Sequence, residues 1–309
     1  MIGLYPCAVS ITITQLRAFL AVVKGGSVTA AADELVVTQP SVSAALAALG
    51  RAVGVDLFER SGRGVRLTDA GAAFAPYAQD IVGLLEAGRR AALGAADAAA
   101  HSLRIAAVPT AAESFVPALM RAFGQAHPGA ELTLVVGNNE EVLARVLSHE
   151  DDVAVSGRPP TGDRLIAMPF LQNEIVCITS ADDATTTAGP IPSSTLTDRS
   201  WLLRERGSGT RAMNERFLAD RGLAPRTLTL GSNGAIKQAA RAHLGISLIS
   251  RAAVETELRS GVLGEIRLTD GPEARPWFVV RSAVGPVRPL VEQFSEFART
   301  GADALVPAR

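Results

Sequence analysis

The stretch TAAADELVVTQPSVSAAL, residues 29–46, is rich in alanine and leucine but carries a proline near its middle. Pro40 has no backbone N–H and its ring clashes with the preceding turn, so one helix running through it would lose about 3 kcal/mol. Proline is tolerated in the first turn of a helix, where the N–H has no intrahelical partner. The stretch therefore predicts two helices separated by a tight turn, with Thr38 as the N-cap of the second.

The preceding residues predict another helix, which the sequence KGGS at 24–27 brings to an end. Its apolar side chains follow the spacing of one helix face: Leu16, Phe19, Leu20 and Val23. Ser27 is the expected N-cap of the helix that comes next. Three short helices with a tight turn between the last two predict a helix-turn-helix, whose third helix enters the major groove of DNA.

The sequence DLFERSGRGVRLTDAG, residues 56–71, contains two short segments, FER and VRL, that can pair as a hairpin. Arg63 would lie at its tip, where a basic side chain suits the DNA backbone or minor groove. Gln39 would serve equally well as a first-turn residue without base contact. The candidate DNA-binding residues are Gln39, Pro40, Ser41, Ser43, Arg51 and Arg63.

Four segments between residues 12 and 71 occur in a specific order and spacing: QLRAFLAVV, GSVTAAADEL, TQPSVS and LFERSGRGVRLTDAG. Together they resemble the DNA-binding domain of LysR-type transcriptional regulators. One departure is that the family usually places Arg, Lys or Gln just after the serine at position 43, where this chain has Ala44 and Ala45. The resemblance implies promoter DNA, a small anionic effector, RNA polymerase and further copies of the chain, in a homodimer or homotetramer, as partners.

Residues 69–100 predict a long helix that begins after Thr68, a natural cap. Apolar and small residues recur at alternating steps of four and three, as in a coiled-coil seam: Phe74, Ala78, Ile81, Leu85, Gly88 and Ala92. A helix packed on its own domain is the alternative. Similarity to the LysR family favours a linker helix that pairs two subunits, with Phe74, Ile81 and Leu85 as dimerisation residues.

The remainder, residues 101–309, alternates short apolar runs with helical stretches, which predicts a mostly parallel sheet covered by helices. The resemblance implies two lobes of the periplasmic-binding-protein type, lobe 1 over about 101–176 and 277–300 and lobe 2 over about 177–276, hinged near 175–180 and 270–277. The expected α/β architecture is thus a flexible tail (1–11), a winged helix-turn-helix (12–68), a linker helix (69–100) and an effector-binding domain (101–309).

Three predicted helices of this domain begin with hydroxyl, amide or glycine-backbone donors, in the segments VPTAAES, RERGSGTR and GSNGAIKQ. Donors at helix starts beyond strand ends suit an anion. The candidate effector-binding residues are Thr110, Arg206, Ser208, Thr210, Asn233 and Lys237. Capping and turn formation would also explain several of them. Two segments, RERGSGTR and SNGAIKQAARAHLGISLIS, resemble the LysR branch that regulates Calvin-cycle carbon-fixation operons, whose effectors are phosphorylated or nucleotide metabolites.

Composition is that of an ordinary globular protein, with 48% hydrophobic and 20% charged residues and a net charge of -1 over 309 residues. The N-terminus is a poor secretory signal, and Cys7 and Cys177 lie far apart, so a reducing, cytoplasmic setting is expected. Cys177 is expected to be a small buried hydrophobe, and a redox role would require the Cys7 thiol to reach it.

Catalytic signatures such as HExxH, GxSxG or a Walker loop do not occur in the sequence, and its four histidines are scattered. We therefore expect no enzyme, cofactor or metal. The alternative functions are a solute-binding protein or a small-molecule enzyme built on the C-terminal α/β half. Specific, salt-sensitive binding to promoter DNA would separate these from a regulator.

Overall fold

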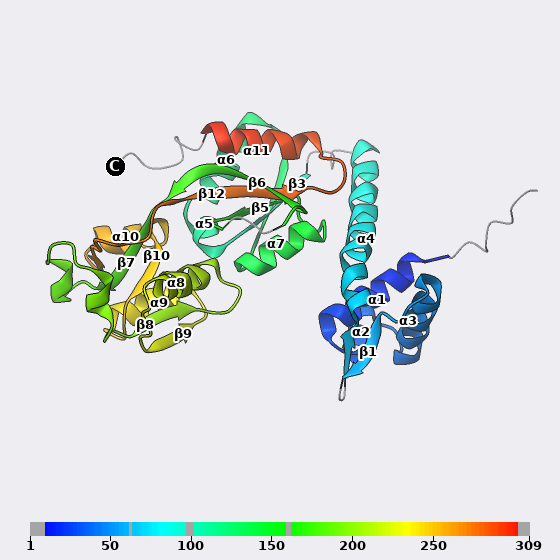
Figure 1. The fold of residues 1–309 in the computed structure, drawn as a ribbon. Helices are drawn as coiled ribbons and strands as arrows, with labels where there is room; N and C mark the ends of the chain where they lie inside the picture. The colour runs from blue at the N-terminus through cyan, green and yellow to red at the C-terminus, as the bar shows by residue number, and fades with distance from the viewer. Residues whose placement is uncertain (1–9, 62–63, 97–101, 159–161, 302–309) are drawn as a thin grey trace, which may run out of the picture. The chain divides into compact units, whose positions relative to one another are not determined.

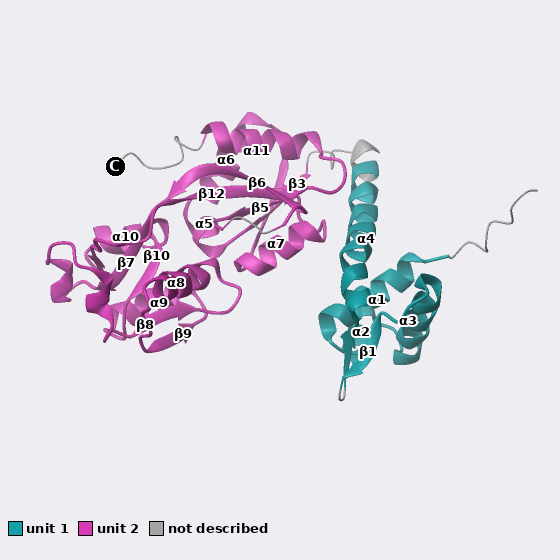
Figure 2. Ribbon diagram, in the orientation of Figure 1, with its two compact units in different colours: residues 1–92 teal, residues 93–309 magenta. Residues whose placement is uncertain are grey.

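The computed structural model describes residues 10–61, 64–96, 102–158 and 162–301 (Figure 1). The chain divides into two compact units, residues 1–92 and 93–309 (Figure 2). Arg63, Cys7 and most of the expected N-terminal tail lie outside the described residues. Over the described part of the chain, no helix has the length and apolarity needed to cross a bilayer.

The first unit contains the expected helix-turn-helix and hairpin. Its helices are α1 (Ile13–Gly25), α2 (Val28–Leu35) and α3 (Gln39–Val53), and its strands β1 (Phe58–Ser61) and β2 (Gly64–Leu67) pair antiparallel. The caps predicted from the sequence are confirmed: Ser27 accepts from the N–H of Ala30, and Thr38 from that of Ser41. Pro40 lies in the first turn of α3, where a missing N–H costs little.

A long helix, α4 (Asp69–Ala96), follows the hairpin, and its first turns pack on the first unit's own core. The side chain of Phe19 is fully buried, with ring centroids 5.2 Å from Phe58 and 5.4 Å from Phe74. Ala78 is fully buried in the same cluster. Phe74 therefore packs, partly buried, against the core of its own domain, whereas the sequence analysis expected it in a subunit seam.

The second unit has two lobes, each with its own core. Lobe 1 is built on a sheet of order β4-β3-β5-β12-β6. Its strands are β3 (Ser102–Ala107), β4 (Glu131–Val136), β5 (Val153–Ser156), β6 (Leu165–Asn173) and β12 (Arg275–Ser282). Its helices are α5 (Pro109–Ser114), α6 (Val116–Ala126), α7 (Asn139–Leu147) and α11 (Pro289–Gly301).

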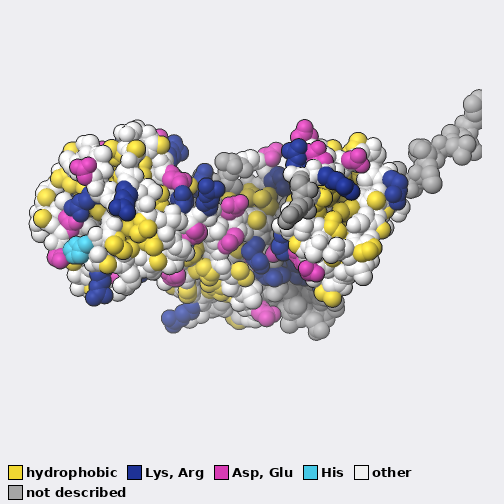
Figure 3. Space-filling view, turned by 90° about the horizontal axis from the view of Figure 1, so that it is seen from below, with side chains coloured by type: hydrophobic (Ala, Val, Ile, Leu, Met, Phe, Trp, Pro, Cys, Tyr) yellow, Lys and Arg dark blue, Asp and Glu magenta, His cyan; other side chains and the backbone are white. Residues whose placement is uncertain are grey.

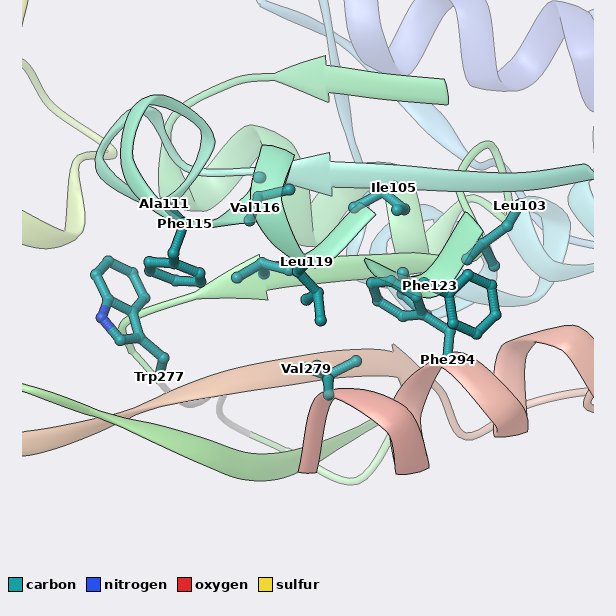
Figure 4. Packing of buried hydrophobic residues seen from close by; sticks show 14 of the residues in the cluster. Leu103, Ile105, Ala111, Phe115, Val116, Leu119, Phe123, Trp277, Val279 and Phe294 are labelled. Atoms are coloured by element: carbon teal, nitrogen blue, oxygen red, sulfur yellow. The ribbon is translucent and has the colours of Figure 1, made fainter. Parts of the chain in front are cut away.

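Aromatic pairs fill the core of lobe 1 (Figure 4). The ring centroids of Phe115 and Trp277 are 5.3 Å apart, and those of Phe123 and Phe294 are 5.2 Å apart. Phe294 lies on α11, near the end of the chain, so α11 completes the core that the earlier elements begin. Burial of each such phenylalanine contributes roughly 1.5–3 kcal/mol.

Lobe 2 contains an antiparallel sheet of order β10-β7-β11 and a parallel pair of β8 and β9. Its strands are β7 (Ile175–Ser180), β8 (Trp201–Arg204), β9 (Thr227–Leu230), β10 (Ser247–Ser250) and β11 (Leu263–Ile266). Its helices are α8 (Gly209–Asp220), α9 (Asn233–Arg241), α10 (Glu255–Arg259) and the short 3-10 turns η2 (Ala184–Thr186), η3 (Ser193–Leu196) and η4 (Arg251–Ala253).

The lobes are joined by two crossings of the chain. Glu174 is the single residue between β6 and β7, and the chain returns between β11 and β12. Residues 175–180, expected as a hinge, form the central strand β7, because their apolar side chains fill the core of lobe 2. The expectation of a mostly parallel sheet is also corrected, since β12 runs antiparallel to both β5 and β6.

Candidate functional site

The helix-turn-helix presents the start of α3 to solvent. Val42 and Leu49 are buried on its inner side, whereas the predicted DNA-contact residues of this helix are exposed: Gln39, Pro40, Ser41, Ser43 and Arg51. The hydroxyls of Thr38 and Ser41 lie 2.8 Å apart, so Ser41 shares a hydrogen bond with the cap. The first turn of α3 therefore offers small polar side chains and N–H groups, which suit close approach to DNA.

The cations of the first unit differ in whether they are already paired. Arg17 pairs with Glu86, Lys24 with Glu34, and Arg66 with Glu59. Arg51 and Arg60 are exposed and have no ion-pair partner among the described residues. These two arginines are thus free to meet phosphates, and Arg60, on β1, is one that the sequence prediction did not include.

On the face of the molecule displayed in Figure 3, Lys and Arg side chains are scattered among Asp and Glu rather than gathered into one patch. This distribution agrees with the net charge of -1. Attraction to DNA therefore depends on a few local cations and on helix ends.

A partly open cavity of about 30 Å³ lies between the two lobes of the second unit. Thr110, Ser208 and Thr210, three of the predicted effector-binding residues, line it. Thr110 follows β3 in lobe 1, whereas Ser208 caps α8 in lobe 2 by accepting from the N–H of Arg211. The structure thus brings together helix starts from both lobes, as the sequence predicted.

The other predicted effector residues occupy different places. Asn233 is buried behind the cavity wall, where its Nδ2 donates to Thr110 Oγ1 over 2.8 Å. Arg206 is exposed and lines a separate groove beside α7 and α8. Lys237 donates to Glu257 Oε1 over 2.7 Å and to the carbonyl of Ala253. Arg206 and Lys237 are therefore not part of the cavity lining, which corrects their predicted positions.

Three arginines that the sequence prediction missed also line the cavity: Arg204, Arg158 and Arg275. Arg204 pairs with Glu205, whereas Arg158 and Arg275 differ from it in this respect. Nε of Arg275 is buried without a hydrogen-bond partner. Neither guanidinium has a hydrogen bond or ion pair within the described ranges. Burial, followed by the charge of Arg158, lowers the pKa of Arg275. Since a guanidinium stays protonated in proteins, two positive charges lie beside the cavity, the exposed Arg158 and the partly buried Arg275.

Strand pairing explains why these two arginines meet. β5 and β12 pair antiparallel with Ser156 opposite Phe278, so Arg158, just after β5, comes next to Arg275 at the start of β12. The only sequence signal for this cluster is an arginine at each of two strand ends. A single sequence does not reveal which strand ends are neighbours.

Comparison with protein families identifies two matches: the bacterial regulatory helix-turn-helix protein, lysR family, over residues 13–72, and the LysR substrate binding domain over residues 96–303. This chain belongs to the LysR family of transcriptional regulators. Its relatives are named transcriptional regulators and not enzymes. The two family matches show that this LysR chain combines a DNA-binding domain with an effector-binding domain.

The relatives also confirm the resemblance to carbon-fixation regulators. The LysR chain is 33% identical over 287 residues to the RuBisCO operon transcriptional regulator of Acidithiobacillus ferrooxidans, covering 93% of each chain. Its regulatory part is similar to the CcmR regulatory domain of Synechocystis PCC6803 in complex with 2-PG, at 32% identity and a TM-score of 0.61, covering 64% of this chain and 96% of that one. The full-length regulator CbnR shares the fold at 22% identity, with a TM-score of 0.62 over 94% of this chain and 99% of that one.

Proposed function

We propose that this LysR regulator binds an interrupted inverted repeat in a promoter as a symmetric homo-oligomer, and that a small anion in the interlobe cavity controls its activity. Residues 12–68 would read DNA, 69–100 would pair subunits, and 101–309 would bind the effector. RNA polymerase is the partner that such a promoter complex would meet.

The DNA part of the proposal is supported by the exposed start of α3. Each subunit presents one such helix, and a two-fold assembly presents two, which calls for paired half-sites. In this proposal the exposed Gln39 and Ser43 would face base edges, whereas Arg51 and Arg60 would meet phosphates.

A mobility shift on the regulator's own upstream region tests this part. Arg51→Ala should weaken binding to every fragment and reduce the salt slope by about 1, because one phosphate contact is lost. Ser43→Ala should chiefly reduce discrimination between the specific fragment and a scrambled one. Arg216→Ala, an exposed arginine of the second unit, is the matched control. The placement of α3 on DNA is wrong if both substitutions in the first unit behave like this control.

The effector part rests most directly on Arg158 and Arg275, which line the cavity without an ion-pair partner among the described residues. Two guanidiniums without a carboxylate partner are stabilised by an oxyanion, which accepts several of their N–H groups at once. Hydroxyls of Thr110, Ser208 and Thr210 line the same cavity and can donate as well. Binding of 2-PG by the similar CcmR domain supports a phosphorylated or carboxylated small molecule.

Isothermal calorimetry of the full chain with 2-PG, phosphoenolpyruvate and uncharged glycerol tests this part. Both anions should bind and glycerol should not. Arg275→Gln should weaken anion binding roughly 10- to 100-fold, since a hydrogen-bonded charge is worth about 1.5–3 kcal/mol. Arg216→Gln should leave the affinity unchanged. Absence of binding by either anion, or an equal response of the two variants, contradicts the anion assignment.

A further inference from the structure

Three buried side chains, Arg204, Asn233 and Thr110, form a series of hydrogen bonds from lobe 2 to lobe 1 behind the cavity. We call this series the relay. Arg204, Asn233 and Thr110 have exposed fractions of 4%, 2% and 5%. Nη1 of Arg204 donates to Oδ1 of Asn233, and Nδ2 of Asn233 donates to Oγ1 of Thr110 over 2.8 Å. Arg204 and Thr110 both line the cavity, whereas Asn233 links them from behind.

The direction of these hydrogen bonds is fixed by chemistry. A guanidinium only donates, so the amide oxygen of Asn233 must face Arg204 and the amide nitrogen must face Thr110. The amide nitrogen also only donates, so the Thr110 hydroxyl must accept from it. The hydroxyl proton of Thr110 is therefore left to point elsewhere. No hydrogen bond in the described part of the chain uses that proton.

Arg204, the first residue of the relay, is held in place by Glu205. Glu205 accepts from Nε and Nη2 of Arg204 over 2.7 and 2.8 Å, a bidentate pair that neutralises the charge and fixes the guanidinium plane. The remaining nitrogen, Nη1, is the one that reaches Asn233. Arg204, Asn233 and Thr110 are all buried, so water does not compete for the hydrogen bonds between them.

We infer that Asn233 is a positioning residue that makes Thr110 a hydrogen-bond donor to the effector. This inference rests on the proposed function, because it requires an anion in the interlobe cavity. The relay favours a ligand that offers an acceptor oxygen to Thr110. It disfavours a ligand that offers an N–H there, because two donors would then meet.

Asn233→Asp tests the relay with almost no change in size. A carboxylate still accepts from Arg204 but cannot donate, so Thr110 would turn its proton toward residue 233 and away from the ligand. Calorimetry of the full chain with 2-PG and phosphoenolpyruvate should show binding weakened roughly 10- to 100-fold. Gln238→Glu, an exposed residue on the same helix α9, makes the same change from amide to acid and should leave the affinity within about twofold.

A double-mutant cycle with Thr110→Val separates positioning from a general charge effect. When the hydroxyl is absent, Asn233→Asp has no proton to redirect, so its further effect should fall below about threefold. An Asn233→Asp effect of the same size in both backgrounds overturns the relay, because the new charge would then act directly on the anion. Asn233→Ala, which adds no charge, should show the same dependence on Thr110 and serves if the aspartate variant does not fold.

The outcomes also separate the relay from the proposed function. If the unmutated protein binds neither anion, the proposed effector class fails and the relay fails with it. If the unmutated protein binds an anion and both Asn233 variants bind it equally well, only the relay is overturned.

Discussion

Val36 has the least favourable backbone geometry of the helix-turn-helix. It occupies the left-handed region, with φ 55 and ψ 47, and 90% of the residue is exposed. A β-branched side chain is strained there, and no burial compensates for the strain. We expect Val36→Asn to stabilise the first unit by about 1 kcal/mol, since asparagine tolerates this conformation.

Hydrogen exchange of buried α1 and α3 amides in the full chain measures the Val36→Asn effect, and protection should rise about fivefold. Val37→Asn is the control, because Val37 is also exposed but does not have a positive φ. Equal protection in the two variants would mean that Val36 carries no strain.

Cys177 is a buried thiol in the core of lobe 2, and burial raises its pKa to about 12 from an ordinary value of 9.0. Below pH 9 the thiol is neutral in both folded and unfolded chains. Above pH 9 only the unfolded chain ionises, so folding stability should fall by up to about 1.4 kcal/mol per pH unit until the folded thiol also ionises.

The Cys177→Ala variant should lack this component of the pH dependence. Urea denaturation of both proteins between pH 7 and 11 measures it, because other titrating groups cancel in the difference. The stability advantage of the unmutated protein should be constant below pH 9 and shrink above it. A constant difference up to pH 11 would show that the thiol ionises equally in both states.

At the scale of elements, α4 divides into a part that packs on its own domain and a part that does not. Beyond Ala78, one stripe of the helix is exposed, with Ile81 at 48% and Leu85 at 49%. Ile81→Asp should split the proposed homo-oligomer, because pairing of two such helices would bury an unpaired charge. Light scattering measures the mass, and Ala91→Asp, at an exposed position about 80° around the helix from Ile81, is the control. An unchanged mass in Ile81→Asp would exclude this stripe from the subunit contact.

Local signals made some elements predictable. The caps at Ser27, Thr38 and Thr68 depend on neighbouring residues only, and all three hydroxyls accept from the following helix. Strand β6 is hard to predict from the sequence, because Pro169 interrupts its apolar run. The structure accommodates that proline because β6 is an edge strand with a register shift opposite Trp277 and Phe278.

Only those residues of the candidate site that lie at the starts of helices could be predicted from the sequence. Thr110, Ser208 and Thr210 follow strands, and that rule placed them at the cavity. The positions of long charged side chains cannot be predicted in this way, because their partners come from distant segments of the sequence. Lys237 forms an ion pair with Glu257, whereas Arg158 and Arg275 are brought together by the pairing of β5 with β12. Tertiary pairing therefore decides which arginine or lysine is available for a ligand.

At the scale of the whole molecule, the geometry of the effector domain constrains how a ligand enters. The cavity volume of about 30 Å³ has room for only about two water molecules. Hydrogen bonds join the two lobes beside it: Asn233 donates to Thr110, and the N–H of Glu140 donates to the carbonyl of Gly207 over 3.3 Å. A phosphorylated metabolite is several times larger, so the lobes must separate at their two crossings before it binds.

Lobe opening should therefore limit the rate of effector binding. Trp277 lines the cavity, whereas Trp201, the other of the two tryptophans, is fully buried in the core of lobe 2. In a Trp201→Phe variant, fluorescence reports on Trp277 alone. Stopped-flow mixing with 2-PG should give a rate that levels off as ligand increases, because opening becomes limiting. A Trp277→Phe variant should give little signal. A rate that rises linearly to the highest concentration would mean that the cavity is already open before the ligand arrives.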